Sequence, residues 1–133
     1  MASIHIDTII RAPAATVWAA LAATSEAHRA FAGVLTDCRL ESEDVRVVTF
    51  VNGLVVKEQI VAVDPERRRI AYAAIESGLA HHSASMQVSS ATDGTCRFVW
   101  ITDVLPHEAA EWIHPLMEKG AQALKANVKS AAE

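Results

Sequence analysis

The centre of the chain, residues 45–63, reads VRVVTFVNGLVVKEQIVAV. The Asn52-Gly53 pair in its middle is the strongest short-range signal for a β-hairpin, because a tight two-residue turn needs positive φ angles. With a two-residue turn, Val47 would face Glu58 across the hairpin. This register predicts a solvated face with Arg46, Lys57 and Gln59, and an inward face made of Val45, Val47, Thr49, Val51, Leu54, Val56, Glu58, Ile60 and Ala62.

Glu58 is the only carboxylate on that otherwise apolar inward face. A carboxyl group in such a place must be paired, hydrated or protonated. One interpretation is a structural ion pair or a carboxylate at a wet cavity mouth. The other is a group that polarises a ligand or moves a proton, since perturbed acids gather at functional sites.

Strand patterns continue on both sides of the hairpin. Period-two alternation predicts strands over residues 3–11, 34–41, 70–75, 82–90 and 95–104, with turns at Asp64-Pro65 and Asp93-Gly94. Between the first two strands, Ala12-Pro13 begins a helix, because proline fits the first helical turn. A second short helix is expected from Thr24 to about Phe31, before Gly33.

The tail from residue 107 to about residue 131 has a helical period. Its apolar stripe is Ile113, Met117, Ala121, Leu124 and Val128. Pro115 lies inside this pattern and predicts a break or kink, with the long regular part starting near it. The order of one strand, two helices, six strands and one long helix predicts an α+β fold: a curved antiparallel sheet of about seven strands wrapped around the C-terminal helix.

Length and charge limit the classes of function. A chain of 133 residues suits one domain spanning residues 1–133. Sixteen acidic residues against twelve basic ones leave a net charge of −4, so no nucleic-acid partner is expected. No apolar run approaches the roughly 18 residues of a membrane span, and residues 1–11 do not resemble a signal peptide. Two cysteines are too few for a disulfide scaffold, so we expect a cytoplasmic protein without membrane insertion.

The composition of the interior is unusual. Hydrophobic residues make up 51% of the chain, but 25 of its residues are alanine and only 5% are aromatic. Large apolar side chains are therefore scarce. Small residues on inward faces would leave an internal volume unfilled.

Several of these features occur together, in order, in one superfamily. The matching pieces are Ala12-Pro13 before Val17-Trp18; Val45-Arg46-Val47; Gly53 with Glu58 five positions on; Asp64; Arg68 and Tyr72; Trp100 six residues before Pro106; and Gly120 before Leu124-Lys125. In these features the chain resembles the START-like or SRPBCC superfamily, the helix-grip fold, and within it the bacterial polyketide cyclase/dehydrase-like branch.

The resemblance implies a cavity between the curved sheet and the terminal helix that holds a mostly apolar ligand. The superfamily includes aromatic polyketide cyclases, lipid and sterol carriers, and abscisic-acid receptors. Glu58 falls where the abscisic-acid receptors use a glutamate in ligand contact. Fold analogy alone does not assign a function.

Other inward positions supply candidate ligand contacts. His82 shares a strand face with Met86 and is either a proton shuttle or donor, or a satisfied core histidine. Tyr72, the only tyrosine, is in phase with Ile70 and Ala74 and serves either packing or ligand contact.

The sequence does not decide which residues of the strand around Trp100 point inward. A two-residue turn at Asp93-Gly94 would put Val99, Ile101 and Asp103 inward, and a three-residue loop would put Phe98, Trp100 and Thr102 there. From the terminal helix, Met117, Gly120, Ala121 and Leu124 would form the cavity floor, with Gly120 leaving room for a ligand.

Other chemistries find little support. His107, Glu111 and His114 share one helix face, but Pro115 disturbs their register and no fourth ligand follows, so no metal is expected. Neither a phosphate-binding glycine loop nor a dinucleotide motif occurs, so no cofactor is expected. Cys38 is interpreted as a small buried residue.

Three functions are compatible with the sequence. The first is binding of a small hydrophobic or aromatic molecule; the second is a polyketide cyclase/dehydratase-like lyase or isomerase with Glu58 and His82 as acid/base groups. The third is a dimeric interaction module with a filled cavity. The ligand-binding candidates are Thr36, Glu58, Tyr72, His82, Met86, Ile101, Met117, Gly120 and Leu124.

Overall fold

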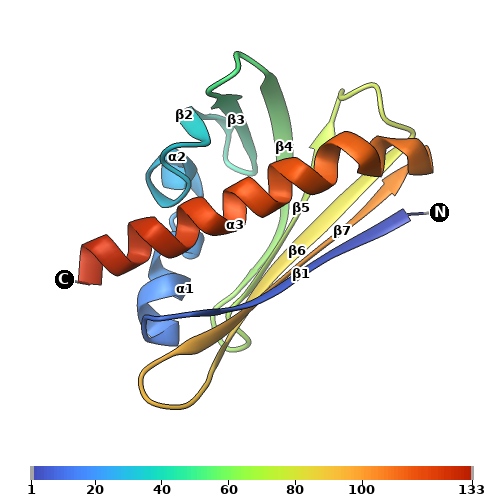
Figure 1. Cartoon of the computed structure of the whole chain (residues 1–133). Coiled ribbons are helices and arrows are strands. Elements are labelled where there is room, and N and C mark those ends of the chain that lie inside the picture. The colour runs from blue at the N-terminus through green and yellow to red at the C-terminus, as the bar shows by residue number, and fades with distance from the viewer. Residues whose placement is uncertain (1, 133) are drawn as a thin grey trace.

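The computed structural model describes residues 2–132 and shows a curved seven-stranded antiparallel sheet with a long helix across its concave face (Figure 1). The strand order is β1-β7-β6-β5-β4-β3-β2. The elements are β1 (Ala2–Ile10), α1 (Ala14–Ala22), η1 (Thr24–Glu26), α2 (Ala27–Ala30), β2 (Leu35–Ser42), β3 (Val45–Phe50), β4 (Val55–Asp64), β5 (Arg69–Ile75), β6 (His81–Ser90), β7 (Cys96–Leu105), η2 (His107–Ala109) and α3 (Ala110–Ala132). The predicted α+β helix-grip architecture is confirmed.

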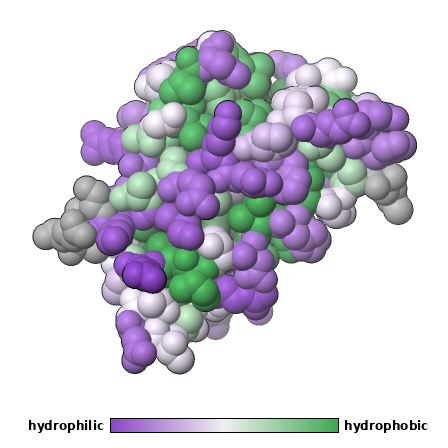
Figure 2. Space-filling model, in the orientation of Figure 1, coloured by the Kyte–Doolittle hydropathy of each residue, from purple (hydrophilic) through white to green (hydrophobic). Residues whose placement is uncertain are grey.

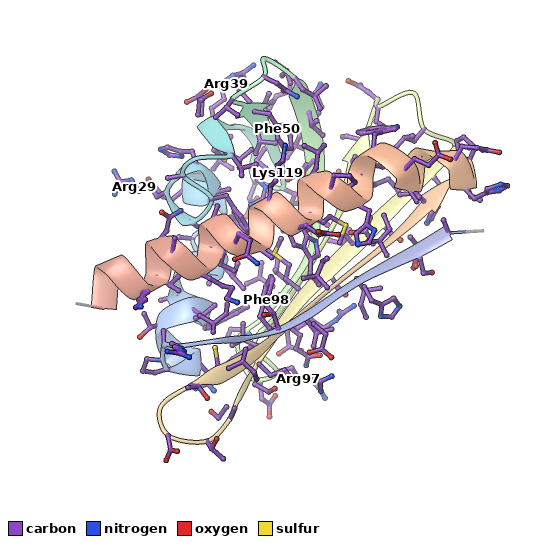
Figure 3. All side chains as sticks on the ribbon, viewed as in Figure 1. Arg29, Arg39, Phe50, Arg97, Phe98 and Lys119 are labelled. Carbon is purple, nitrogen blue, oxygen red and sulfur yellow. The ribbon has the colours of Figure 1, made fainter. Side chains whose placement is uncertain are left out.

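Sequence neighbours pair from β2 to β7, and β1 closes the order by pairing with β7. The buried positions of β7 alternate along the strand, as a sheet covered on one face requires. Figure 3 shows Phe98 on the side of β7 that α3 covers, whereas the neighbouring Arg97 points away and pairs with Asp7 of β1. The concave face of the sheet is therefore the inner wall of the fold.

The core lies between this face, α1 and α3. Ile10, Val17, Ile70, Phe98 and Leu124 are almost completely buried and come from three strands and both of these helices. A smaller cluster of Ala27, Cys38 and Val48 lies under the short helices at the β2–β3 end of the sheet. Burial raises the pKa of the Cys38 thiol, which fits its interpretation as a buried residue.

The terminal helix begins earlier than Pro115 suggested. η2 runs directly into α3 at Ala110, and Pro115 lies within the helix. Proline removes a single backbone donor, and here Ile113 and Met117 on either side of it are buried in the core. Packing of the apolar stripe therefore extends the helix over the predicted break.

The β3–β4 hairpin has a different register from the one predicted. Gly53 donates its N–H to the Phe50 carbonyl, and Phe50 donates to the Leu54 carbonyl, so the loop has three residues instead of two. Gly53 has a φ of 90°, which glycine adopts without strain. Arg46 then pairs with Glu58, and Val47 pairs with Lys57. A slip of one residue moves every β3 side chain to the other face, so Arg46 points inward and the predicted solvated position was wrong.

The β6–β7 hairpin resolves the alternative left open for Trp100. Asp93 and Gly94 form a tight turn, but Ala91 donates its N–H to the Thr95 carbonyl, which leaves Thr92 as an extra residue. Met86 consequently pairs with Trp100. The inward residues of β7 are those expected from a three-residue loop: Phe98, Trp100 and Thr102.

Among residues 2–132, no helix is long and apolar enough to cross a membrane.

Candidate ligand cavity

A cavity of about 240 Å³ lies between the concave face of the sheet and α3. Five neighbouring strands, β3 to β7, supply its sheet wall. The opposite wall is apolar and comes from α2 and α3. The residues that define these walls are Phe31, Arg46, Val48, Phe50, Val56, Glu58, Tyr72, Ala74, His82, Met86, Trp100, Thr102, Ile113, Leu116, Met117 and Gly120.

An ion pair lies in the wall of this cavity. The Nε of Arg46 is 2.8 Å from Oε1 of Glu58, and the two side chains are only 7% and 12% exposed. Arg46 also donates from Nη1 to the Thr24 carbonyl at 3.0 Å, and its guanidinium lies 5.4 Å from the centre of the Tyr72 ring. These three contacts fix the guanidinium and, through it, one oxygen of Glu58.

His82 takes part in the backbone bonding of the sheet. The Ala74 N–H donates to Nδ1 of His82 at 2.9 Å. Pairing of β5 with β6 ends at Tyr72 and Ala84, two residues before Ala74 would face His82. The imidazole therefore substitutes for the next backbone acceptor. Burial lowers the pKa of His82, and the nearby Glu58 charge opposes this shift only in part.

A polar row crosses the sheet at this level. Arg46 pairs with Glu58 across β3 and β4, Glu58 pairs with Ala74 across β4 and β5, and Ala74 bonds His82 of β6. Because Ala74 has only a methyl group, it leaves open the space between the carboxylate and the imidazole. The row thus places two chemically different groups on either side of a gap in the cavity wall.

Tyr72 and Trp100 form a second polar contact. Nε1 of Trp100 donates to the Tyr72 hydroxyl at 3.1 Å. The Tyr72 ring lies 6.1 Å from that of His82, and Trp100 lies 5.8 Å from Phe31. Burial, together with the Glu58 charge, raises the pKa of Tyr72 far above its ordinary value. Tyr72 is therefore a neutral hydroxyl at every ordinary pH.

Gly120 has a different role from the expected one. A Cβ atom on Gly120 would lie 3.0 Å from Cζ3 of Trp100 and 3.1 Å from Cη2. Such contacts are tighter than most real Cβ contacts, so the indole would have to shift to make room for a side chain at Gly120. Gly120 borders the cavity, but it leaves room for Trp100 and not for a ligand.

Six of the predicted ligand-binding residues lie together on the cavity wall: Glu58, Tyr72, His82, Met86, Met117 and Gly120. Three lie elsewhere. Thr36 is exposed beside a bulge in β2 and bonds the Thr49 carbonyl, and Ile101 is on the outer face because of the extra residue Thr92. Leu124 is completely buried in the packed core, one helical turn beyond the cavity.

Arg46 is the charged wall residue that the sequence-based prediction missed. Its signal was present in the sequence: an arginine between valines on a strand directly beside one with an inward glutamate. Residues that lie directly or diagonally across from each other on neighbouring strands are favoured when their charges have opposite signs. That preference would have supported the three-residue loop over the two-residue turn.

Apolar side chains form part of the mouth of the cavity. Leu54 and Val55 are 38% and 59% exposed at the end of the β3–β4 hairpin, and Trp112 of α3 is 51% exposed. Figure 2 shows hydrophobic surface gathered beyond the hydrophilic outer stripe of α3, on the side of this hairpin. The entrance is thus less polar than the outer face of the helix.

The histidines of the hypothetical metal set are engaged in pairs. His107 lies 3.2 Å from Glu108, and His114 lies 3.0 Å from Glu118. Within residues 2–132, no three His, Cys, Asp or Glu side chains lie close enough to hold a metal ion.

A curved sheet gripping a C-terminal helix defines the class of START-like proteins. The chain belongs to the family described as polyketide cyclase / dehydrase and lipid transport, whose family model matches residues 1–129. A comparison with curated proteins gave no match.

Solved structures with the same fold are distant in sequence. The protein XoxI from Bacillus cereus has a TM-score of 0.87 at 18% identity, covering 100% of this chain and 99% of its own. A START superfamily protein from Mycobacterium smegmatis has a TM-score of 0.80 at 13% identity, with 97% and 98% coverage. Norcoclaurine synthase from Thalictrum flavum, a point mutant in complex with a transition state analogue, has a TM-score of 0.72 at 19% identity, with 99% and 96% coverage. These similarities show the fold alone.

Proposed function

We propose that residues 1–133 form one domain that binds a small hydrophobic or aromatic molecule in the cavity between the sheet and α3. The observation that carries this proposal is the cavity itself, about 240 Å³ with aromatic and aliphatic walls and only a few polar groups. Ligand sites generally have this composition. Norcoclaurine synthase, which shares the fold, has been solved in complex with dopamine and hydroxybenzaldehyde.

Small side chains support the same proposal. Ala74 lies on the cavity wall between larger neighbours, where any bulkier residue would occupy the open volume. Ala73, its neighbour in β5, lies on the opposite face of the strand and pairs with Gln59. The two alanines therefore form a matched pair for a test.

The test is a titration of acetophenone into Ala74→Leu, Ala73→Leu and the unchanged protein, followed by the NMR signal of the Trp100 indole N–H. The proposal expects this signal to shift in the unchanged protein and in Ala73→Leu, and to stay fixed in Ala74→Leu. The same shift in all three proteins would place the ligand outside the cavity and contradict the proposal.

A second, catalytic function is favoured by one observation: Glu58 and His82 border the same cavity. In this proposal Glu58 removes a proton from the carbon next to a ligand carbonyl. The C–H electron pair forms the new C=C bond. The carbonyl oxygen then carries the negative charge and accepts a hydrogen bond from the N–H of His82. Return of the proton completes an isomerisation or exchange.

Deuterium exchange separates catalysis from binding. In D2O, a catalytic cavity would speed deuterium incorporation into the methyl group of acetophenone, and Glu58→Gln would abolish the acceleration. Exchange at the buffer rate, with binding retained, would contradict the catalytic proposal alone.

The third hypothesis, a dimeric module with a filled cavity, agrees with the ion pair of Glu58 but not with an open volume of this size. A homodimer stays a prediction of its own. Light scattering of the purified protein over a range of concentrations tests it.

A further inference from the structure

Resting on the proposed function, we propose that the cavity selects an uncharged aromatic molecule of about one ring with two polar substituents on one edge. A hydroxyl group would donate to Oε2 of Glu58. A carbonyl oxygen on a second substituent, in the 1,3 position relative to the hydroxyl, would accept from the Nε2–H of His82.

The acceptor in the wall is one oxygen of Glu58. Oε1 receives the Nε–H of Arg46, whereas Oε2 has no hydrogen-bond partner among residues 2–132. A carboxylate has only acceptor sites, and a ligand that covers Oε2 without donating to it would leave this oxygen unpaired at a cost in free energy. The ligand group that meets Oε2 must therefore donate.

One donor in the wall is the imidazole of His82. Its Nδ1 accepts the Ala74 N–H, so this nitrogen carries no proton. A neutral imidazole then has its proton on Nε2. No acceptor for Nε2 occurs within the part of the chain that the structure describes. The ligand group that meets His82 must therefore accept.

Three other hydroxyl groups, those of Tyr72, Ser77 and Thr102, also border the cavity. Since a hydroxyl both donates and accepts, none of them decides the ligand class. Tyr72 is already committed to Trp100. The directional requirements come from Glu58 and His82.

The spacing of these two groups sets the arrangement of the ligand substituents. Glu58 and His82 lie on β4 and β6, with Ala74 of β5 between them. Two strand spacings put about 10 Å between the two backbones. Glu58 bonds Arg46 of β3 and His82 bonds the Ala74 backbone of β5, so separate ligand atoms must serve the two groups. A 1,3 arrangement on one ring provides that separation.

The volume limits the ligand to about one ring. An engineered cavity of about 150 Å³ accepts benzene. A cavity of about 240 Å³ accommodates that ring with two short substituents.

Charge excludes anions from this position. The Arg46 charge is neutralised by Glu58, and His82 is held neutral by its Nδ1 bond. Lys57, at the mouth, is already paired with Glu41 and Glu76. A ligand carboxylate would approach the Glu58 carboxylate without a free cation, and like charges repel in a poorly solvated site. Carboxylates such as benzoates and fatty acids are therefore rejected.

Four probes of nearly equal size test the proposal by calorimetry: 3-hydroxyacetophenone, acetophenone, 3-ethylphenol and 3-hydroxybenzoate. The expected order places 3-hydroxyacetophenone first. Loss of the hydroxyl, in acetophenone, weakens binding roughly 10-fold or more, because that bond is to a charged group. Loss of the carbonyl, in 3-ethylphenol, weakens binding about 5-fold. The anion 3-hydroxybenzoate binds weakest.

Two variants assign each preference to its residue. Glu58→Gln removes the carboxylate and is expected to reduce the advantage of the hydroxyl. His82→Asn keeps an oxygen for the Ala74 N–H but lacks Nε2–H, so the advantage of the carbonyl disappears while that of the hydroxyl persists. The unchanged Trp100 indole signal of the free variants verifies that each is folded.

The outcomes separate this inference from the proposed function. Equal affinity for all three neutral probes, or tightest binding of 3-hydroxybenzoate, overturns the inference and leaves cavity binding intact. Preferences that persist unchanged in both variants also overturn it. The absence of binding by every probe at millimolar concentration contradicts both proposals.

Discussion

Arg46 and Glu58 face each other across β3 and β4, with Nε of the guanidinium 2.8 Å from Oε1 of the carboxylate in the cavity wall. The pair is almost removed from solvent, and the bond to the Thr24 carbonyl ties it to η1. It therefore joins the β3–β4 half of the sheet to the helical segment that closes that end of the fold.

Removal of one partner from this pair should be costly. Arg46→Met leaves the Glu58 carboxylate buried without its cation, and we expect a loss of about 3–5 kcal/mol in the free energy of unfolding. The double variant Arg46→Met/Glu58→Leu should regain most of that loss, because two apolar groups need no pairing. Urea denaturation measures both. A loss below about 1 kcal/mol in Arg46→Met would show that the pair is solvated.

Ionisation of Tyr72 can be followed without interference, because it is the only tyrosine in the chain. Burial raises its pKa, so ultraviolet absorbance should show no phenolate near pH 10, where free tyrosine ionises. The phenolate should appear only when alkali unfolds the protein, together with loss of the circular dichroism signal. A reversible titration near pH 10 in the folded protein would contradict the burial of Tyr72.

His82 should make stability depend on pH. Burial lowers its pKa in the folded state, so the unfolded chain binds the proton more readily. The contribution of neutral His82 is fully present above the unfolded pKa of about 6.5 and is lost as the pH falls through the lower folded value. Denaturation at several pH values should show a steeper acid-side loss for the unchanged protein than for His82→Asn. Parallel curves for the two proteins would refute this assignment.

Gly120 and Trp100 should show coupled effects on stability. Gly→Ala inside a helix normally stabilises by up to about 1 kcal/mol. Here the new methyl group meets the indole at 3.0 Å, and overpacking of this kind costs about 1–3 kcal/mol. Gly120→Ala should therefore be neutral to destabilising in the unchanged protein and stabilising in Trp100→Phe. Equal effects in both backgrounds, measured by thermal denaturation, would show that the two residues are independent.

The sequence predicted most of the fold, because its strand and helix periods are strong and its turns contain glycine, asparagine or proline. The β4 face with Glu58 was predicted correctly from alternation alone. The β3 face was wrong for one reason: Asn52-Gly53 marks a turn, but the number of loop residues depends on which hydrogen bonds close it. One additional residue, Val51, moved Arg46 from solvent to the cavity wall.

The same limit applied to β7, where the extra residue Thr92 decided between Trp100 and Ile101. Contacts between segments that are distant in the sequence could not be predicted from local sequence patterns either. The packing of Trp100 against Gly120 and the bond from Ala74 to His82 join positions whose distance depends on the curvature of the whole sheet. Alternation predicts which face of the sheet a side chain lies on, but not which other side chains it contacts there.

The bond between Ala74 and His82 also has a consequence for how this fold can be altered. Where the backbone pairing of β5 and β6 ends, the His82 side chain bonds the Ala74 N–H and keeps the two strands together. The connecting residues 76–80 are therefore not needed for this contact. Residues added to or exchanged in that loop would change the border of the cavity mouth, where Leu79 lies, while the strand register behind it stays as it is. Here the chain offers a place where ligand selectivity could be varied separately from stability.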